Sequence, residues 1–297
     1  MNRINNILNV KKLHKIYGNG RGVNVAVLDS GMYPHPDLIN NLVFFKDIVE
    51  NKVKPYDDSS HGTHICGIIA AYGPYPGIAP GAGLIPIKVL DKSGTGYSYN
   101  IIEGIDWIKQ NYERYNIRIV NISIGTKSIS CDDESSLLVK AVDELWDMGL
   151  VVVTSAGNNG PGYNTITVPG ISRKVITVGS NDPMPHRDSG GKIQTAYSGK
   201  GPTFCNVVKP DILAPARNII SCANIGREYA AKSGTSMSTP IVSGAAALTL
   251  CANPALSNEE FKRILCNSSS DIGLDRYTQG CGFINLTKLL FLAVNPV

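Results

Sequence analysis

Apolar and polar positions along this chain form blocks that predict strands separated by helices. Five apolar runs, rich in β-branched residues, end at Gly- or Ser-containing turns, and most of them lack a polar-apolar alternation. Continuous apolar runs of this length are typical of strands buried on both faces of a parallel sheet. The runs cover residues 23–28, 84–90, 117–124, 150–154 and 175–178.

Between these runs, apolar residues recur at helical spacing. Ile101, Ile105 and Ile108 share one face with Tyr112, and Leu138, Ala141, Val142 and Leu145 share another. Ser257 and Glu260 form a capping-box sequence just before a third apolar face. Strands that alternate with helices predict an α/β fold, here a three-layer αβα arrangement with a mostly parallel central sheet. No repeat or linker divides the chain, so we expect one domain over residues 1–297.

Composition and charge narrow the function classes. Hydrophobic residues make up 43% of the 297 residues and charged residues 18%, which indicates a globular chain. The net charge of +4 gives no reason to expect nucleic acid or an anionic membrane as a partner. The longest apolar run, at 241–252, is too short to span a bilayer, and the first residues lack the apolar segment of a signal peptide.

Seven cysteines are present, and none of them forms a C-x-x-C motif. This spacing is unlike that of zinc sites or of small disulfide-rich domains, so we expect reduced and mostly buried thiols. Cys66, five residues after His61, is expected to be a small core residue. Reduced thiols favour a reducing compartment.

Four polar residues lie where strands end or helices begin. Asp29 and Asn158 follow predicted strands, while His61 and Ser236 stand at predicted helix starts. Ligands of open α/β sheets bind outside the carboxyl ends of the strands, so these side chains can converge there. A serine at a helix N-terminus has free N–H groups beside it but needs a base to become a nucleophile. Each residue alone is more simply a turn, cap or surface position; their combination points to a site.

The segments around these residues resemble the subtilisin-like serine proteases. The resemblance is carried by Val-Leu-Asp-Ser-Gly at 27–31, His-Gly-Thr-His at 61–64, Ser-Ala-Gly-Asn at 155–158 and Gly-Thr-Ser-Met-Ser-Thr-Pro at 234–240. Further similar segments lie at 77–80, 88–90, 121–125, 209–211 and 280–285, so the resemblance covers roughly residues 10–290. The order Asp, His, Ser along the chain is that of subtilisin.

The resemblance implies catalytic roles. Ser236 would attack a peptide carbonyl, His61 would act as base and then as acid, and Asp29 would orient the imidazole. Asn158 would donate its side-chain amide to the oxyanion, together with the Ser236 backbone N–H. The second histidine of the motif, His64, is expected to be structural.

The resemblance also implies a cleft that binds a peptide or protein substrate. The expected walls of its primary pocket are Ser123, Ile124 and Gly125 on one side and Ser155, Ala156 and Gly157 on the other. An edge formed by Gly94, Thr95 and Gly96 would pair with the substrate backbone as an added strand. Thr167, before a Val168–Pro169 bond expected to be cis, would make the pocket floor shallower than glycine would.

Asp57 and Asp58 allow two interpretations. They are either a solvated acidic turn before His61 or the source of a preference for basic residues near the scissile bond.

Two departures from secreted subtilisins bear on metal and location. The segment 70–77 is short and has no Asn or Asp, whereas calcium takes six to eight oxygen ligands. We therefore expect weak or no calcium binding there, no metal ligands, and no cofactor in the chemistry. Only about twenty residues precede the first predicted strand, too few for the family's pro-segment. With the cysteines and Met1 this favours an intracellular type; a secreted, processed form stays open.

The leading hypothesis is thus a serine endopeptidase that works through an acyl-enzyme. The alternative is a catalytically silent subtilase that acts as a binding or regulatory protein. An α/β esterase or lipase is disfavoured, because its Ser-Asp-His order and G-x-S-x-G elbow do not match Ser236.

Overall fold

Seven parallel strands form the central sheet, in the order β11-β8-β6-β4-β1-β3-β2. The computed structural model describes residues 1–181, 186–187, 193–194 and 197–295. The strands of this sheet are β1 (Asn24–Asp29), β2 (Lys46–Asp47), β3 (Gly83–Lys88), β4 (Ile117–Ile122), β6 (Val151–Ser155), β8 (Ile176–Ser180) and β11 (Ile212–Ala214). Every predicted strand overlaps one of them.

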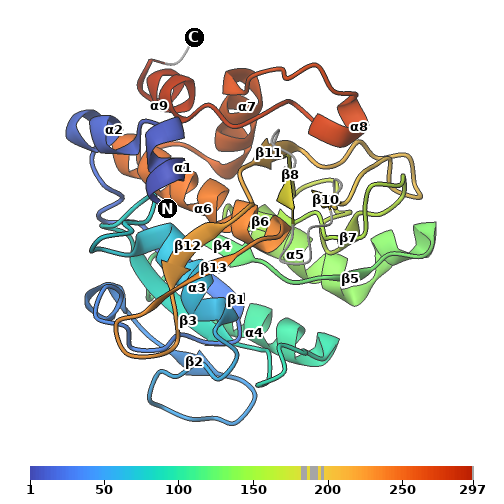
Figure 1. Cartoon of the computed structure of the whole chain (residues 1–297). Coiled ribbons are helices and arrows are strands. Elements are labelled where there is room, and N and C mark those ends of the chain that lie inside the picture. Colours follow the sequence, from blue (N-terminus) through green and yellow to red (C-terminus); the bar gives the residue numbers. More distant parts are fainter. Residues whose placement is uncertain (182–185, 188–192, 195–196, 296–297) are drawn as a thin grey trace.

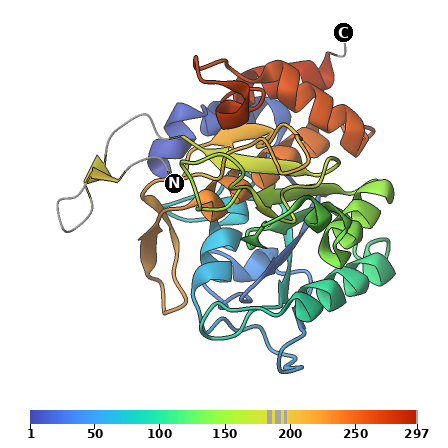
Figure 2. The same ribbon diagram turned by 90° about the vertical axis from the view of Figure 1, so that its right-hand side faces the viewer.

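Helices cover both faces of the sheet, which gives the three-layer αβα fold that the sequence predicts (Figure 1). On one face α3 (His61–Ala70) packs against α6 (Thr235–Ala252), and on the other α4 (Ser98–Asn111) packs against α5 (Leu137–Asp147). Helix α2 packs on α9, so helices from the first and last parts of the chain, blue and red in Figure 2, lie side by side. The remaining helices are α1 (Asn2–Ile7), α2 (Val10–Tyr17), α7 (Asn258–Ser268), α8 (Arg276–Gln279), α9 (Leu286–Val294) and the short 3-10 helices η1 (Ile39–Asn41) and η2 (Cys131–Ser135).

The core is one cluster of buried hydrophobic residues around β1 and α6. Val25, Ala26, Val27 and Leu28 are all at most 1% exposed, as expected for a strand covered on both faces. The capping box of α7 is present, because Ser257 Oγ accepts the Glu260 N–H at 3.2 Å and Glu260 accepts the Ser257 N–H at 2.9 Å.

Three small antiparallel pairs lie outside the central sheet and were not predicted. Their strands have two to four residues, too short for a hydrophobic period to reveal them. They are β5 (Thr126–Lys127) with β7 (Thr167–Val168), β9 (His186–Arg187) with β10 (Ile193–Gln194), and β12 (Ile219–Cys222) with β13 (Tyr229–Lys232).

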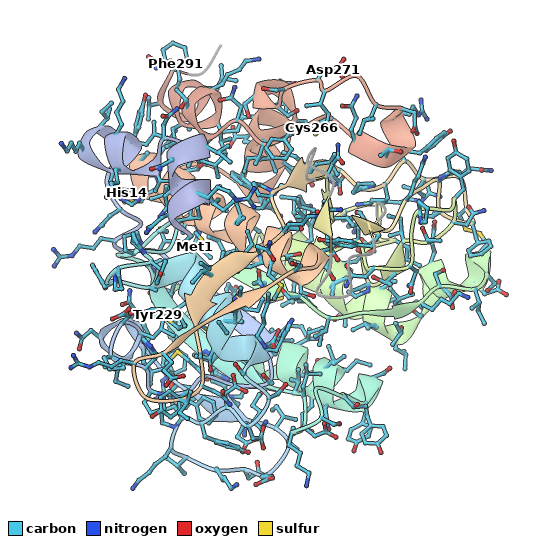
Figure 3. The ribbon with its side chains drawn as sticks, in the orientation of Figure 1. Met1, His14, Tyr229, Cys266, Asp271 and Phe291 are labelled. Atoms are coloured by element: carbon cyan, nitrogen blue, oxygen red, sulfur yellow. A yellow bond between two sulfur atoms is a disulfide. The ribbon has the colours of Figure 1, made fainter. Side chains whose placement is uncertain are left out.

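The prediction that all cysteines are reduced is wrong for four of the seven. Cys131 is bonded to Cys205 and Cys266 to Cys281, with Cα–Cα distances of 5.1 and 5.2 Å. The first pair is 74 residues apart, so only the fold brings its sulfurs together. These two disulfides remove the argument for a reducing compartment, because that argument assumed reduced thiols. Figure 3 labels Cys266.

Cys66 is fully buried in α3, as expected for a core residue, and burial raises the pKa of its thiol. Within the described ranges, no helix has both the length and the apolar character needed to cross a membrane.

Candidate active site

Asp29, the last residue of β1, is fully buried at the carboxyl edge of the sheet. Its Oδ1 accepts the Ser30 backbone N–H at 2.8 Å and lies 2.7 Å from Nδ1 of His61. A buried carboxylate is stable only when it is paired or hydrogen-bonded. This contact therefore sets the tautomer of His61: Nδ1 carries the proton that Asp29 accepts, and Nε2 is left as a base.

A second carboxylate, Asp57, holds the start of α3 where His61 stands. Asp57 is 6% exposed and accepts the backbone N–H groups of Ser59, Ser60 and Thr63, each at 2.9 Å. It also accepts the Ser30 hydroxyl at 2.8 Å, and Ser30 Oγ in turn accepts the Gly62 N–H at 2.9 Å. Asp57 is therefore not a solvated turn residue, because its carboxylate is buried against the N–H groups at the start of α3. The preference for basic residues stays a prediction.

Asp58 is also part of the support under the site. It forms an ion pair with the fully buried Lys88 at 2.6 Å. The Lys88 ammonium also donates to the carbonyls of Ser30 at 2.9 Å and Leu90 at 2.8 Å. The Asp58 side chain itself is 34% exposed, so its interpretation as the source of a preference for basic residues stays a prediction.

The electrostatic surroundings of His61 favour its charged form overall. Burial of the ring lowers the pKa of His61, but the charge and hydrogen bond of Asp29 raise it, and the net direction is above 6.5. Lys232 lowers the same pKa and Asp57 raises it. The imidazole can therefore take a proton and hold it beside Asp29.

His64 is placed quite differently, as the sequence suggested. Its Nε2 donates to the carbonyls of Ile219 at 2.9 Å and Ala230 at 3.0 Å, which fastens α3 to both strands of the β12–β13 pair. Burial lowers the pKa of His64 to about 3, so the ring is neutral.

Ser236 lies in the first turn of α6, after Gly234 at φ 145°, a backbone angle that side chains rarely allow. Its Oγ donates to the Ser123 carbonyl at 2.9 Å. Among the described residues no hydrogen bond joins Ser236 to His61, although both line one cleft of about 560 Å³.

Asn158 follows β6 and reaches the same cleft. Its Oδ1 accepts the backbone N–H of Thr235 at 3.0 Å and the Thr235 hydroxyl at 3.2 Å. Because both donors fix the amide oxygen, the Nδ2 group keeps its two N–H donors for another acceptor.

Most of the predicted substrate-binding residues line this cleft. They are Gly94, Gly96, Ser123, Ile124, Gly125, Ser155, Gly157 and Thr167. Thr95 and Ala156 are not among its lining residues. Thr95 instead donates its N–H to Asp91 at 3.0 Å, and Ala156 is buried and accepts the Thr167 N–H at 3.1 Å.

Thr167 lies between the two glycines of the expected walls. A Cβ added at Gly125 would come 2.8 Å from Thr167 Oγ1, and one at Gly157 would overlap Thr167 Cγ2. The Val168–Pro169 bond that follows is cis, as predicted. The threonine side chain therefore fills the space between Gly125 and Gly157.

Sequence reasoning missed Lys232 and the apolar lining residues Leu90, Ile101 and Leu138. The position of Lys232, four residues before Ser236, was the one signal that could have identified it.

Within the part of the chain that the structure describes, the one group of three clustered metal-ligand types is His35, Asp37 and Cys222. His35 Nε2 lies 3.2 Å from the Glu228 carbonyl, and its Nδ1 accepts the Asp37 N–H at 3.1 Å. Asp37 accepts the Tyr229 hydroxyl at 2.7 Å. A metal would have to displace these bonds, so the cluster is a poor fit for one. Weak or absent calcium binding at 70–77 stays a prediction.

The fold and this set of residues define a subtilisin-like serine protease domain. The chain belongs to the subtilase family, whose model matches residues 20–283. It is 44% identical to the serine protease AprX of Bacillus subtilis (strain 168) over 273 residues, 84% of this chain and 62% of that protein. It is 35% identical to subtilisin Savinase of Lederbergia lenta over 269 residues, 90% of each.

Among solved structures, the chain is similar to sphericase, with a TM-score of 0.77 and 31% identity over 92% of this chain and 96% of the other. The chain spans less than two thirds of the length of AprX.

Proposed function

We propose that this protein is a serine endopeptidase with Asp29, His61 and Ser236 as its catalytic triad. The observation that carries the proposal is the 2.7 Å contact between Asp29 Oδ1 and His61 Nδ1, with Ser236 and Asn158 in the same cleft. Family membership supports it, because the named relatives are serine proteases.

In this mechanism the Ser236 hydroxyl first leaves the Ser123 carbonyl and turns toward His61. His61 Nε2 takes the hydroxyl proton while Ser236 Oγ attacks the substrate carbonyl, and Asp29 stabilises the imidazolium. Asn158 Nδ2 and the Ser236 N–H stabilise the oxyanion. The imidazolium then protonates the leaving amine, and water, activated by His61, hydrolyses the acyl-enzyme.

Substrate binding follows from the cleft. The backbone of the peptide would lie along Gly94 and Gly96 as an added strand, and the side chain before the scissile bond would enter between Gly125 and Gly157. With Thr167 at its base, this pocket favours small or medium side chains.

One observation favours the alternative of a silent binding protein: Ser236 Oγ is bonded to Ser123 rather than to His61. A fluorophosphonate probe separates the two, since it reacts only with an activated serine. We expect labelling and peptide hydrolysis by the wild type and by Ser135→Ala, an exposed control, and neither by Ser236→Ala. A wild-type protein that binds peptides without being labelled would support the silent alternative.

A further inference from the structure

Lys232 lies at the edge of the active-site cleft and has no ionic partner among the described residues. Its side chain is partly buried and lines the cleft with His61 and Ser236. In the described part of the chain it makes no ion pair or side-chain hydrogen bond, unlike Lys88 and Lys209, which pair with Asp58 and Asp211.

The fold holds the backbone of Lys232 firmly in this place. Lys232 ends β13 opposite Ile219 of β12, and His64 bonds the carbonyls of Ile219 and Ala230. The Asn218 N–H adds a bond to Ser233 Oγ at 3.0 Å. Figure 1 shows this strand pair beside α3, and Figure 3 labels Tyr229 at the start of β13.

The position of Lys232 relates it to one side of the scissile bond. The proposed function assigns the acyl half of the substrate to Gly94, Gly96 and the pocket between Gly125 and Gly157. Lys232 comes instead from the strand pair on α3, beside His61, and its charge lowers the pKa of that histidine. His61 protonates the leaving amine, so the residues after the scissile bond pass on this side.

We infer that Lys232 selects substrates that carry a carboxylate within the first two residues after the scissile bond. The inference rests on the proposed function and names the substrate class of the same site. A partly buried ammonium that has no ionic partner among the described residues gains one when such a carboxylate binds, whereas a substrate lysine at the same place would be repelled.

The carboxylate has two sources. It can be the side chain of Asp or Glu inside a longer chain, or the α-carboxylate of a substrate that ends two residues after the cut. Both are acceptors for a lysine ammonium. Peptides that end in a free acid or in an amide distinguish them.

The test measures kcat/KM for quenched fluorescent peptides. The peptides differ only at the first or the second residue after the scissile bond, and this residue is Glu, Gln or Lys. All of these peptides end in an amide. One further Gln peptide ends two residues after the scissile bond and carries a free α-carboxylate. The enzymes are the wild type, Lys232→Gln, Lys232→Glu and the control Lys12→Gln, which removes an exposed charge on α2. Fluorophosphonate labelling of each protein is measured first.

We expect the wild type and Lys12→Gln to favour Glu over Gln about two- to fivefold, the range for a partly exposed ion pair. Lys232→Gln should lose this preference, and Lys232→Glu should favour Lys. The wild-type preference should also fade in 1 M salt, where the screening length is about 3 Å. If only the free-acid peptide is favoured, the partner is the α-carboxylate.

Equal rates for the amidated Glu peptide, the amidated Gln peptide and the free-acid Gln peptide in a labelled, active wild type would overturn the inference and leave the protease intact. A preference for Glu over Gln that persists in Lys232→Gln would also overturn the inference. Absence of labelling and of all cleavage would overturn the proposed function, and the inference with it.

Discussion

The hydroxyl of Ser236 donates to the backbone carbonyl of Ser123 at 2.9 Å, inside the cleft that His61 also lines. The hydroxyl is therefore held away from the imidazole. Serine side chains move between staggered rotamers in picoseconds to nanoseconds, so the hydroxyl can leave this carbonyl rapidly, as the proposed mechanism requires.

Asp29→Asn should lower kcat by about 10⁴, the loss found when the triad aspartate of another serine protease is made asparagine. The amide can donate to Nδ1 of His61, which would leave Nε2 protonated and unable to act as a base. Steady-state kinetics and the labelling rate with a fluorophosphonate measure the change. A loss smaller than tenfold would contradict the proposed role of Asp29.

The pH profile should follow the raised pKa of His61. Activity needs the neutral imidazole, so the acid limb of kcat/KM is expected above pH 6.5. Lys232 lowers this pKa, so Lys232→Gln should move the limb to higher pH. An unchanged limb in the variant would show that the two charges are not coupled.

The same shift has a consequence for stability. A raised pKa means that the folded state binds the proton more tightly than the unfolded state. The stabilisation from protonated His61 is then fully present below pH 6.5 and lost as pH rises through the folded pKa. Melting curves of the wild type and His61→Gln across pH 5–9 measure the difference.

Asn158→Ala should reduce kcat by about 10²–10³ with little change in KM, the range known for removal of this type of donor in subtilisin. Thr235→Val is expected to have a smaller effect, because the Thr235 N–H still fixes Asn158 Oδ1 at 3.0 Å. A rise in KM at constant kcat would show that Asn158 binds the ground state instead.

Thr167→Gly should deepen the primary pocket. Removal of the side chain between Gly125 and Gly157 leaves room for an aromatic residue before the scissile bond. We expect the kcat/KM ratio of Phe to Ala peptides to rise about tenfold. Thr165→Gly, which lies two residues earlier and outside the cleft lining, is the control. An unchanged ratio would mean that Thr167 does not limit the pocket.

The Cys131–Cys205 bond should stabilise the wall of the cleft. Cys131 begins η2, and along the sequence η2 stands between Thr126 and Leu138, two residues that line the cleft. Replacing both cysteines by serine should lower the free energy of unfolding by about 2–4 kcal/mol and raise KM severalfold. Cys266→Ser with Cys281→Ser is the matched control, because that bond joins α7 to a segment outside the cleft lining and should leave KM unchanged.

The sequence predicted the central sheet and the placement of Asp29, His61, Asn158 and Ser236, because each stands at a strand end or helix start that local pattern locates. In a parallel sheet the carboxyl ends of the strands lie along one edge, so these four residues come together there. The structure places all four around one carboxyl edge.

Features that depend on distant segments were out of reach. Cys131 and Cys205 meet only because η2 folds beside the loop near residue 205. Asp57 looks like a surface residue in the sequence, yet the N–H donors at the start of α3 and the Ser30 hydroxyl enclose it. Lys232 lies on a four-residue strand with no apolar period.

Gly31 and Gly62 pack so closely that a Cβ on Gly62 would overlap the Gly31 carbonyl oxygen, and Gly31 itself has a φ of 109°. This contact sets how near α3 can approach the end of β1, and hence how near His61 comes to Asp29. If every residue were substituted in turn and each variant were scored by its proteolytic activity, Gly31 and Gly62 should tolerate substitution as poorly as the triad residues. Neither glycine carries a reactive group. Such a scan would mark them as active-site residues for a purely geometric reason.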